Sequence, residues 1–354
     1  MENKNPETSK SNPTSDGIGH DQGTTPDISQ NFSSKMSDTV TDWVGLERLE
    51  GFNLGDVFSE ALKKHSSHEV EDYFTVGAPS TTPNIENVET SWPKPWVFLR
   101  TFIAAAVIYF IFVQAWHSYQ NPNLVPGLIF MGSFAIPLSA LIFFFEMNAR
   151  KNVSLYQVIR LVFLGGIISL IISLFFFDLT DKIHLDWMGA SIAGLAEEPG
   201  KLMALLIVVN ATRFRYTLNG LLFGAAIGTG FAAFESAGYA LSAGLDYGGP
   251  SMLDTIMYRG MLAPFGHIIW TAMCGAALWR VKGGNKFRME MLQDPRFYRV
   301  FVTAVIMHMI WNSPLVLPFY AKNLILGVVG WIIIFSLIQS GLKQIKEEKL
   351  IASQ

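Results

Sequence analysis

The chain carries little charge and almost no cysteine. Only 16% of its 354 residues are charged, whereas a typical soluble protein has about a quarter. Its single cysteine, Cys274, excludes an intramolecular disulfide and any zinc site built from several cysteines. The formal net charge of −3 gives no electrostatic reason to expect a nucleic-acid partner.

The few charged residues are unevenly distributed. Residues 1–95 are polar, and most of the chain after them consists of long apolar runs, with a mean hydropathy of +0.30 overall. The first residues, MENKNPETSKSNPTSDG, lack the apolar stretch of a signal peptide, so we expect the first apolar run to direct the chain to the membrane. The composition therefore indicates a multi-pass membrane protein.

The apolar runs have the length of membrane-spanning helices, which need roughly 20 mostly apolar residues. The candidate spans are 98–116, 124–146, 156–178, 187–209, 217–242, 260–280, 299–318 and 323–342. The fourth and fifth are the least apolar. The sequence thus predicts an all-α fold, a polytopic membrane bundle of about eight transmembrane helices with a cytosolic N-terminal segment.

Composition also sets the expected domain boundaries. Residues 1–42 are rich in Ser, Thr, Asn, Asp and Pro, which predicts a disordered tail. Residues 43–78 carry helical spacing and predict a small helical element in the cytosol, with Leu46, Phe52 and Leu62 in its core. The remaining segments are a linker (79–95), the transmembrane domain (96–345) and a short cytosolic tail (346–354).

Basic residues gather in every second loop, which sets the expected orientation. The largest group lies between the sixth and seventh spans and comprises Arg280, Lys282, Lys286, Arg288, Arg296 and Arg299. The intervening loops hold at most one basic residue each: Lys182, Arg259 or Lys322. Because basic loops tend to stay in the cytoplasm, we expect a plasma-membrane protein with both termini cytoplasmic.

Charged and polar residues interrupt four of the apolar runs. They are Glu197, Glu198 and Lys201 in the fourth, Glu235 in the fifth, His267 in the sixth, and His308 with Asn312 in the seventh. A charge at the centre of a membrane helix costs about 2.5–3.5 kcal/mol, so such residues usually face a cavity. In the predicted orientation the whole set lies at one depth, from the midplane to the outer leaflet. We therefore expect these residues to meet.

Local spacing supports this convergence. His308 and Asn312 lie one turn apart on the same helix face, and Glu198 is spaced for an ion pair with Lys201. Pro199 removes a backbone hydrogen bond and predicts a kink beside the glutamates. The fifth span has a small residue at every fourth position, which allows close helix packing: Gly220, Gly224, Gly228, Ala232, Ser236 and Ala240.

At these residues the sequence resembles the PrsW family of membrane-embedded proteases and, more distantly, the CAAX prenyl endopeptidases and their ABI relatives. The shared pattern is two glutamates followed by a lysine (197–201), Phe-x-x-x-Glu (231–235), and two later histidine helices. The resemblance covers roughly residues 95–340. Ser236 stands where we expect Asn, and Pro-Gly interrupts the first motif. The resemblance implies intramembrane cleavage of single-span regulatory proteins, such as anti-sigma factors.

Peptide hydrolysis needs an activated water, a stabilised oxyanion and a proton for the leaving amine. Glu197 or Glu198 is the expected base, and His267 would share the water or protonate the amine. His308 and Asn312 would donate to the oxyanion. Glu235, the sixth expected catalytic residue, would orient a histidine or the water. Lys201 would support the site by balancing charge.

Three alternatives remain open at this point. His267, His308 and Glu235 could bind zinc, with another glutamate as the base, although the chain has no His-Glu-x-x-His motif. The same groups could form a proton relay in a transporter, a reading weakened by the lack of inverted repeats. A non-catalytic membrane scaffold is the third, but it would be expected to lack a catalytic group.

Overall fold

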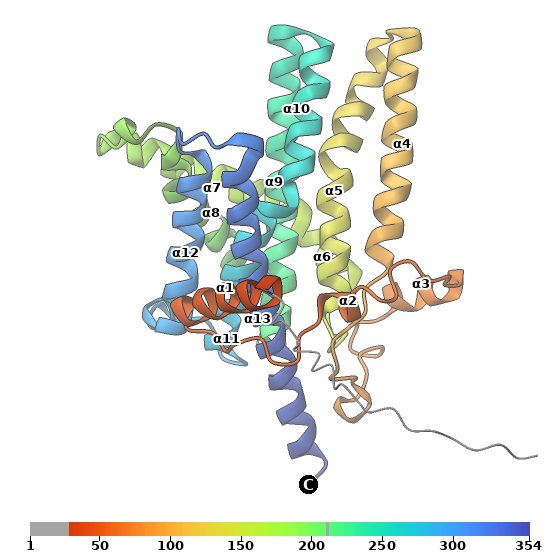
Figure 1. The fold of residues 1–354 in the computed structure, drawn as a ribbon, viewed down its shortest axis with the longest axis vertical. Coiled ribbons are helices and arrows are strands. Elements are labelled where there is room, and N and C mark those ends of the chain that lie inside the picture. The colour runs from red at the N-terminus through yellow and green to blue at the C-terminus, as the bar shows by residue number, and fades with distance from the viewer. Residues whose placement is uncertain (1–27, 210–211) are drawn as a thin grey trace, which may run out of the picture.

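The structure is a computed structural model that describes residues 28–209 and 212–354, and all regular secondary structure in these ranges is helical. Six helical spans in the described ranges are long and apolar enough to cross a membrane. They are Val97–Tyr119, Pro122–Met147, Leu155–Lys182, Thr217–Tyr247, Gly249–Lys282 and Pro318–Ala352. The chain is thus a helical, multi-pass membrane protein (Figure 1).

Two further helices occupy the positions of the fourth and seventh expected spans but are shorter. Helix α8 (Ala193–Val208) has 16 residues and α12 (Pro295–Asn312) has 18. At 1.5 Å per residue they extend only about 24 and 27 Å, against a hydrocarbon core of about 30 Å. The expected count of eight complete spans therefore stays a prediction. These two short helices carry five of the seven candidate site residues.

Helix α9 (Thr217–Tyr247) lies at the centre of the bundle, with 94% of its most apolar window buried. It packs most closely on α11 (His267–Lys282) and also contacts α5 (Val125–Met147). The glycine stripe faces α11: a Cβ added at Gly224 would lie 2.1 Å from the carbonyl oxygen of Thr271. The small residues therefore let the two backbones touch, as the sequence predicts.

Helix α4 (Val97–Tyr119) has the opposite character. Only 6% of its most apolar window is buried, and its apolar side chains face outward. Its N-terminus is fixed by Glu146 at the end of α5, whose carboxylate accepts hydrogen bonds from the backbone N–H groups of Trp96, Val97 and Phe98 at 2.8–2.9 Å. This carboxylate satisfies three of the amides that a helix start leaves unpaired.

A break divides the sixth span. Helix α10 (Gly249–Leu262) follows α9 after a tight turn, where the sequence predicts a loop up to residue 260. The short turn Ala263–Phe265 then leads to Gly266, whose non-helical backbone (φ −118°, ψ −130°) separates α10 from α11. His267 is consequently the first residue of α11. Pro264 and Gly266 account for the break, because neither favours a continuous helix.

The third span and the last span are long. Helix α6 (Leu155–Arg160) continues through a π-helical turn, Leu161–Gly165, into α7 (Gly166–Lys182). Helix α13 (Ala321–Ala352) runs on through most of the segment expected to be a tail, residues 346–354. The C-terminus lies at the same end of the bundle as the N-terminal helices (Figure 1). That end is predicted to be cytoplasmic.

Residues 28–95 pack across this end of the bundle, and most of their buried apolar side chains belong to the main core (Figure 1). Helix α1 (Ile28–Val44) covers residues 28–42, which we expected to be disordered, because Val40 and Val44 are buried in the main core. The rest of that expected tail, residues 1–27, lies outside the described residues.

The expected small helical element is reduced to α2 (Leu54–Val57) and α3 (Ser67–Thr75). Phe52 packs on Phe335 of α13, with ring centroids 4.8 Å apart. Leu62, in contrast, is 90% exposed, so its placement in a core was wrong. The apolar residues of this segment stabilise it by contact with the membrane helices, which a local pattern cannot indicate.

Candidate active site

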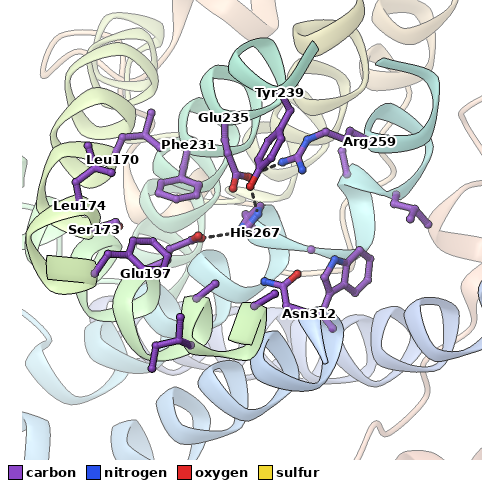
Figure 2. Close-up of a pocket in the computed structure, with 18 of the residues that line it drawn as sticks. Leu170, Ser173, Leu174, Glu197, Phe231, Glu235, Tyr239, Arg259, His267 and Asn312 are labelled. Carbon is purple, nitrogen blue, oxygen red and sulfur yellow. Dashed lines mark hydrogen bonds and ion pairs between the residues drawn. The ribbon is translucent and has the colours of Figure 1, made fainter. Parts of the chain in front are cut away.

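The candidate residues converge from helices α8, α9, α11 and α12 beside a cavity of about 450 Å³ (Figure 2). The cavity is lined by aliphatic side chains of α7 and by polar groups of the other helices. The polar and aromatic residues on its wall are Ser173, Phe177, Glu197, Phe231, Glu235, Tyr239, Tyr258, Arg259, His267, Trp311 and Asn312. The predicted meeting of distant residues therefore occurs in the structure.

Glu198, Lys201 and His308 form the buried floor behind this cavity. The Lys201 ammonium donates to Glu198 Oε1 at 2.6 Å, and the same oxygen lies 2.8 Å from His308 Nδ1. All three side chains are at most 1% exposed. The ion pair expected from the spacing of Glu198 and Lys201 is therefore present, and it also fixes the ring of His308.

Glu197 lies with both histidines on the cavity side of this floor. Its Oε2 is 3.6 Å from His267 Nδ1 and 3.7 Å from His308 Nε2. One ligand atom from each of the three residues falls within 4.8 Å of the others. Glu197 Oε2 is buried yet has no hydrogen-bond partner among residues 28–209 and 212–354.

This group fits a divalent metal ion. Tetrahedral zinc with ligands at 2.0–2.2 Å places its ligand atoms about 3.4 Å apart, close to the separations of Glu197 Oε2 from the two histidine nitrogens. A buried carboxylate oxygen without a partner is the donor that a cation would satisfy. The expected zinc set named Glu235 as the carboxylate, whereas the structure groups Glu197 with His267 and His308.

Glu235 contacts the other nitrogen of His267. Its Oε2 lies 3.1 Å from His267 Nε2 and also accepts a hydrogen bond from Arg259 (Figure 2). His267 Nδ1, in turn, lies 3.0 Å from the Lys201 ammonium. Each histidine of the group thus has one nitrogen within 3.1 Å of a carboxylate and the other within 3.7 Å of Glu197, and in His267 this second nitrogen also contacts Lys201.

Arg259 is the polar residue that the sequence analysis missed. It counted as a loop residue, because the apolar run was taken to begin at 260. The available signal was the segment Ile256–Leu262, which continues the apolar character of the run in the N-terminal direction. If the run is extended to include this segment, Arg259 becomes a charged residue inside a predicted span and therefore a candidate site residue.

Asn312 is the last residue of α12, one turn beyond His308. It lines the cavity, and its amide points toward the space beside His267 in Figure 2. Within the described part of the chain its side chain forms no hydrogen bond. The amide is therefore available to a molecule in the cavity.

Comparison with known protein families identifies the chain. A family model described as "PrsW family intramembrane metalloprotease" matches residues 154–338, more than half of the chain. The chain belongs to this family. Comparisons with curated proteins and with solved structures gave no match.

Membership confirms the resemblance and the peptidase activity that it implied. This PrsW-family protein is an intramembrane protease, and its matched range holds every candidate site residue. Helices α4 and α5 and the N-terminal segment precede the match. The metalloprotease description and the group of Glu197 with two histidines both favour the metal-dependent reading over the metal-independent one. Zinc itself stays a prediction.

Proposed function

We propose that this protease hydrolyses peptide bonds of single-span, membrane-anchored regulatory proteins of the anti-sigma-factor type, using the group formed by Glu197, His267 and His308. The observation that supports it most directly is Glu197 Oε2, a buried carboxylate oxygen without a hydrogen-bond partner in the described chain. This oxygen lies at the wall of the cavity, between the two histidine rings.

Glu197, His267 and His308 would hold a metal ion, and zinc is the expected one. When bound, such an ion makes water a strong nucleophile near neutral pH and polarises a carbonyl group. If the enzyme works without a metal, the same free oxygen of Glu197 is the acceptor for a proton from water. In both cases we prefer Glu197 to Glu198, because Glu197 lines the cavity whereas Glu198 lies behind it with its Oε1 bound to Lys201 and His308.

The surrounding residues keep this group in place. Glu198 holds His308 Nδ1, which directs Nε2 toward Glu197. Glu235 holds His267 Nε2, which directs Nδ1 toward Glu197. Carboxylates of this kind fix the orientation of metal-binding histidines and raise their basicity. The charge of Lys201 offsets the charges of Glu197 and Glu198 in a region with little water.

Asn312 supplies the remaining requirement, a donor for the oxyanion. Its amide faces the cavity, carries no charge and has no competing hydrogen bond with the described residues. A neutral donor at this place would stabilise the developing charge of the tetrahedral intermediate. Leu170 and Leu174 of α7, on the opposite wall, would contact apolar side chains of the substrate.

Cleavage of a panel of single-span membrane proteins by the purified chain in lipid nanodiscs tests this function. Glu197→Gln should abolish cleavage, whereas Glu290→Gln, the same change at an exposed carboxylate, should leave it intact. Strong chelation should inactivate the wild type, and zinc should restore it. Full activity of Glu197→Gln would contradict the proposed site, and chelation without effect would contradict the metal.

A further inference from the structure

Arg259 joins two helices at the edge of the cavity. It lies on α10, seven residues before Gly266, where the sixth span breaks, and its side chain reaches to α9. Its Nε donates to Ser236 Oγ at 2.9 Å, and its Nη2 donates to Glu235 Oε2. The guanidinium also lies over the ring of Tyr239, 4.5 Å from its centroid. These three contacts fix the orientation of the guanidinium group.

Glu235 Oε2 is shared between Arg259 and His267. The same oxygen accepts from Arg259 Nη2 and lies 3.1 Å from His267 Nε2. Any rotation of the Glu235 carboxylate would therefore break both contacts at once. Because Glu235 borders an open cavity, no packed side chain on that side would otherwise fix its orientation.

We infer that Arg259 is a positioning residue, which orients His267 toward Glu197 by fixing the carboxylate of Glu235; the inference rests on the proposed function only in that His267 belongs to the working group. Ser236, the residue that departs from the expected Asn, belongs to the same device because its hydroxyl accepts from Arg259 Nε.

The hydrogen bonds of Arg259 show that its role in positioning Glu235 requires more than a positive charge. A lysine would bring the same charge to Glu235, but only a guanidinium presents two donors in a fixed fork to residues 235 and 236 together. The position of Arg259 in the sequence also supports a positioning role. Arg259 ties α9 to the half-helix before the break, and Glu235 ties α9 to His267 just after it. The pair therefore links α9 to the chain on both sides of the break and adds the side-chain contacts that orient the ring of His267.

Four variants test the inference: Arg259→Gln, Arg259→Lys, Ser236→Ala and, as a control with the same chemical change at an exposed site, Arg288→Gln. Each is measured for kcat and KM and for zinc affinity by competition with a chromophoric chelator, and its thermal unfolding is followed. Loss of a residue that orients a metal ligand lowers metal affinity or activity about 10–100-fold. Arg259→Gln should lose that factor in kcat and in zinc affinity, with KM unchanged.

The milder variants keep the test valid if Arg259→Gln fails to fold. Arg259→Lys should stay clearly impaired, because it retains the charge without the fork. Ser236→Ala removes one hydrogen bond and should cost about two- to tenfold in kcat. In a double-mutant cycle, adding Arg259→Gln to Glu235→Gln should cost little more than Glu235→Gln alone, since both act on His267 through the same contact.

Several results would overturn the inference. Full activity of Arg259→Lys would show that Arg259 contributes only its positive charge. A raised KM with unchanged kcat in Arg259→Gln would show that Arg259 binds the substrate. A wild type that binds zinc but cleaves none of the panel would count against the proposed function, while zinc affinity would still test Arg259. Conversely, loss of cleavage in Glu197→Gln with full activity and zinc affinity in Arg259→Gln would refute this inference alone.

Discussion

One added methyl group on α9 should displace the active site. A Cβ at Gly228 would lie 2.6 Å from the carbonyl oxygen of His267 and 2.9 Å from Cα of Ile268. Ordinary contact begins at 3.4 Å, so the first turn of α11 must retreat by about 0.8 Å, the difference between 3.4 and 2.6 Å. Both neighbours are backbone atoms, which cannot rotate out of the way. His267 would have to move with them.

The expected loss follows from this displacement. A misplacement of about 1 Å at a reacting group can lower the rate by about 10²-fold. Overpacking in a close-packed core costs about 1–3 kcal/mol in stability. Gly228→Ala should therefore lower kcat by about one to two orders of magnitude and lower the thermal unfolding temperature, while the chain still reaches the membrane.

Gly238→Ala is the matched control, because it makes the same change on the same helix at a position with nothing within 4 Å of the added Cβ. Alanine favours a helix over glycine by about 1 kcal/mol, so this variant should be fully active and at least as stable as the wild type. Unfolding can be followed with a thiol-reactive dye, since Cys274 is buried and free. Wild-type kcat in Gly228→Ala would refute the claim that α9 sets the position of His267.

Three further outcomes are expected. Asn312→Ala should lower kcat by about 10²–10³ with little change in KM; a fully active variant would remove the amide from the mechanism. Cysteines introduced at Asp246 and Lys286 should react with impermeant reagents from opposite sides of the membrane, and labelling from one side would contradict the predicted orientation. Glu198→Gln leaves the buried Lys201 charge without its 2.6 Å partner and should cost about 3–5 kcal/mol in stability, as thermal unfolding would reveal; unchanged stability would show that the pair is not needed for folding.

The sequence allowed the convergence of the site to be predicted but not the division of labour within it. Charged residues are conspicuous in apolar runs, so their common depth could be worked out from the loop charges alone. Glu197 and Glu198, however, are adjacent and differ by about 100° in direction around a helix. Which of them faces the cavity depends on how α8 is rotated against α9 and α12, and that is decided by packing across the whole bundle.

Span lengths were predictable only where helices are continuous and apolar. Helices α4 and α5 are predominantly apolar, and their bounds match the expected spans closely. The start of α10 was missed because Asp254 and Arg259 lower the hydropathy of a segment that is nonetheless helical. The hydrogen-bond partners of Arg259 lie on α9, and an ion pair between residues on different helices cannot be predicted from the local sequence pattern.

The contrast between α4 and α9 bears on how relatives of this chain can diverge. Both helices are candidate spans of one bilayer, yet the most apolar window is 6% buried in α4 and 94% buried in α9. Along α4, one apolar residue can replace another with little effect, because lipid adapts to any shape. Along the buried part of α9, most positions contact neighbouring helices that cannot adapt in this way. Natural variants should therefore accumulate quickly in the first helix and slowly in the second, so that the two would evolve at different rates within one protein.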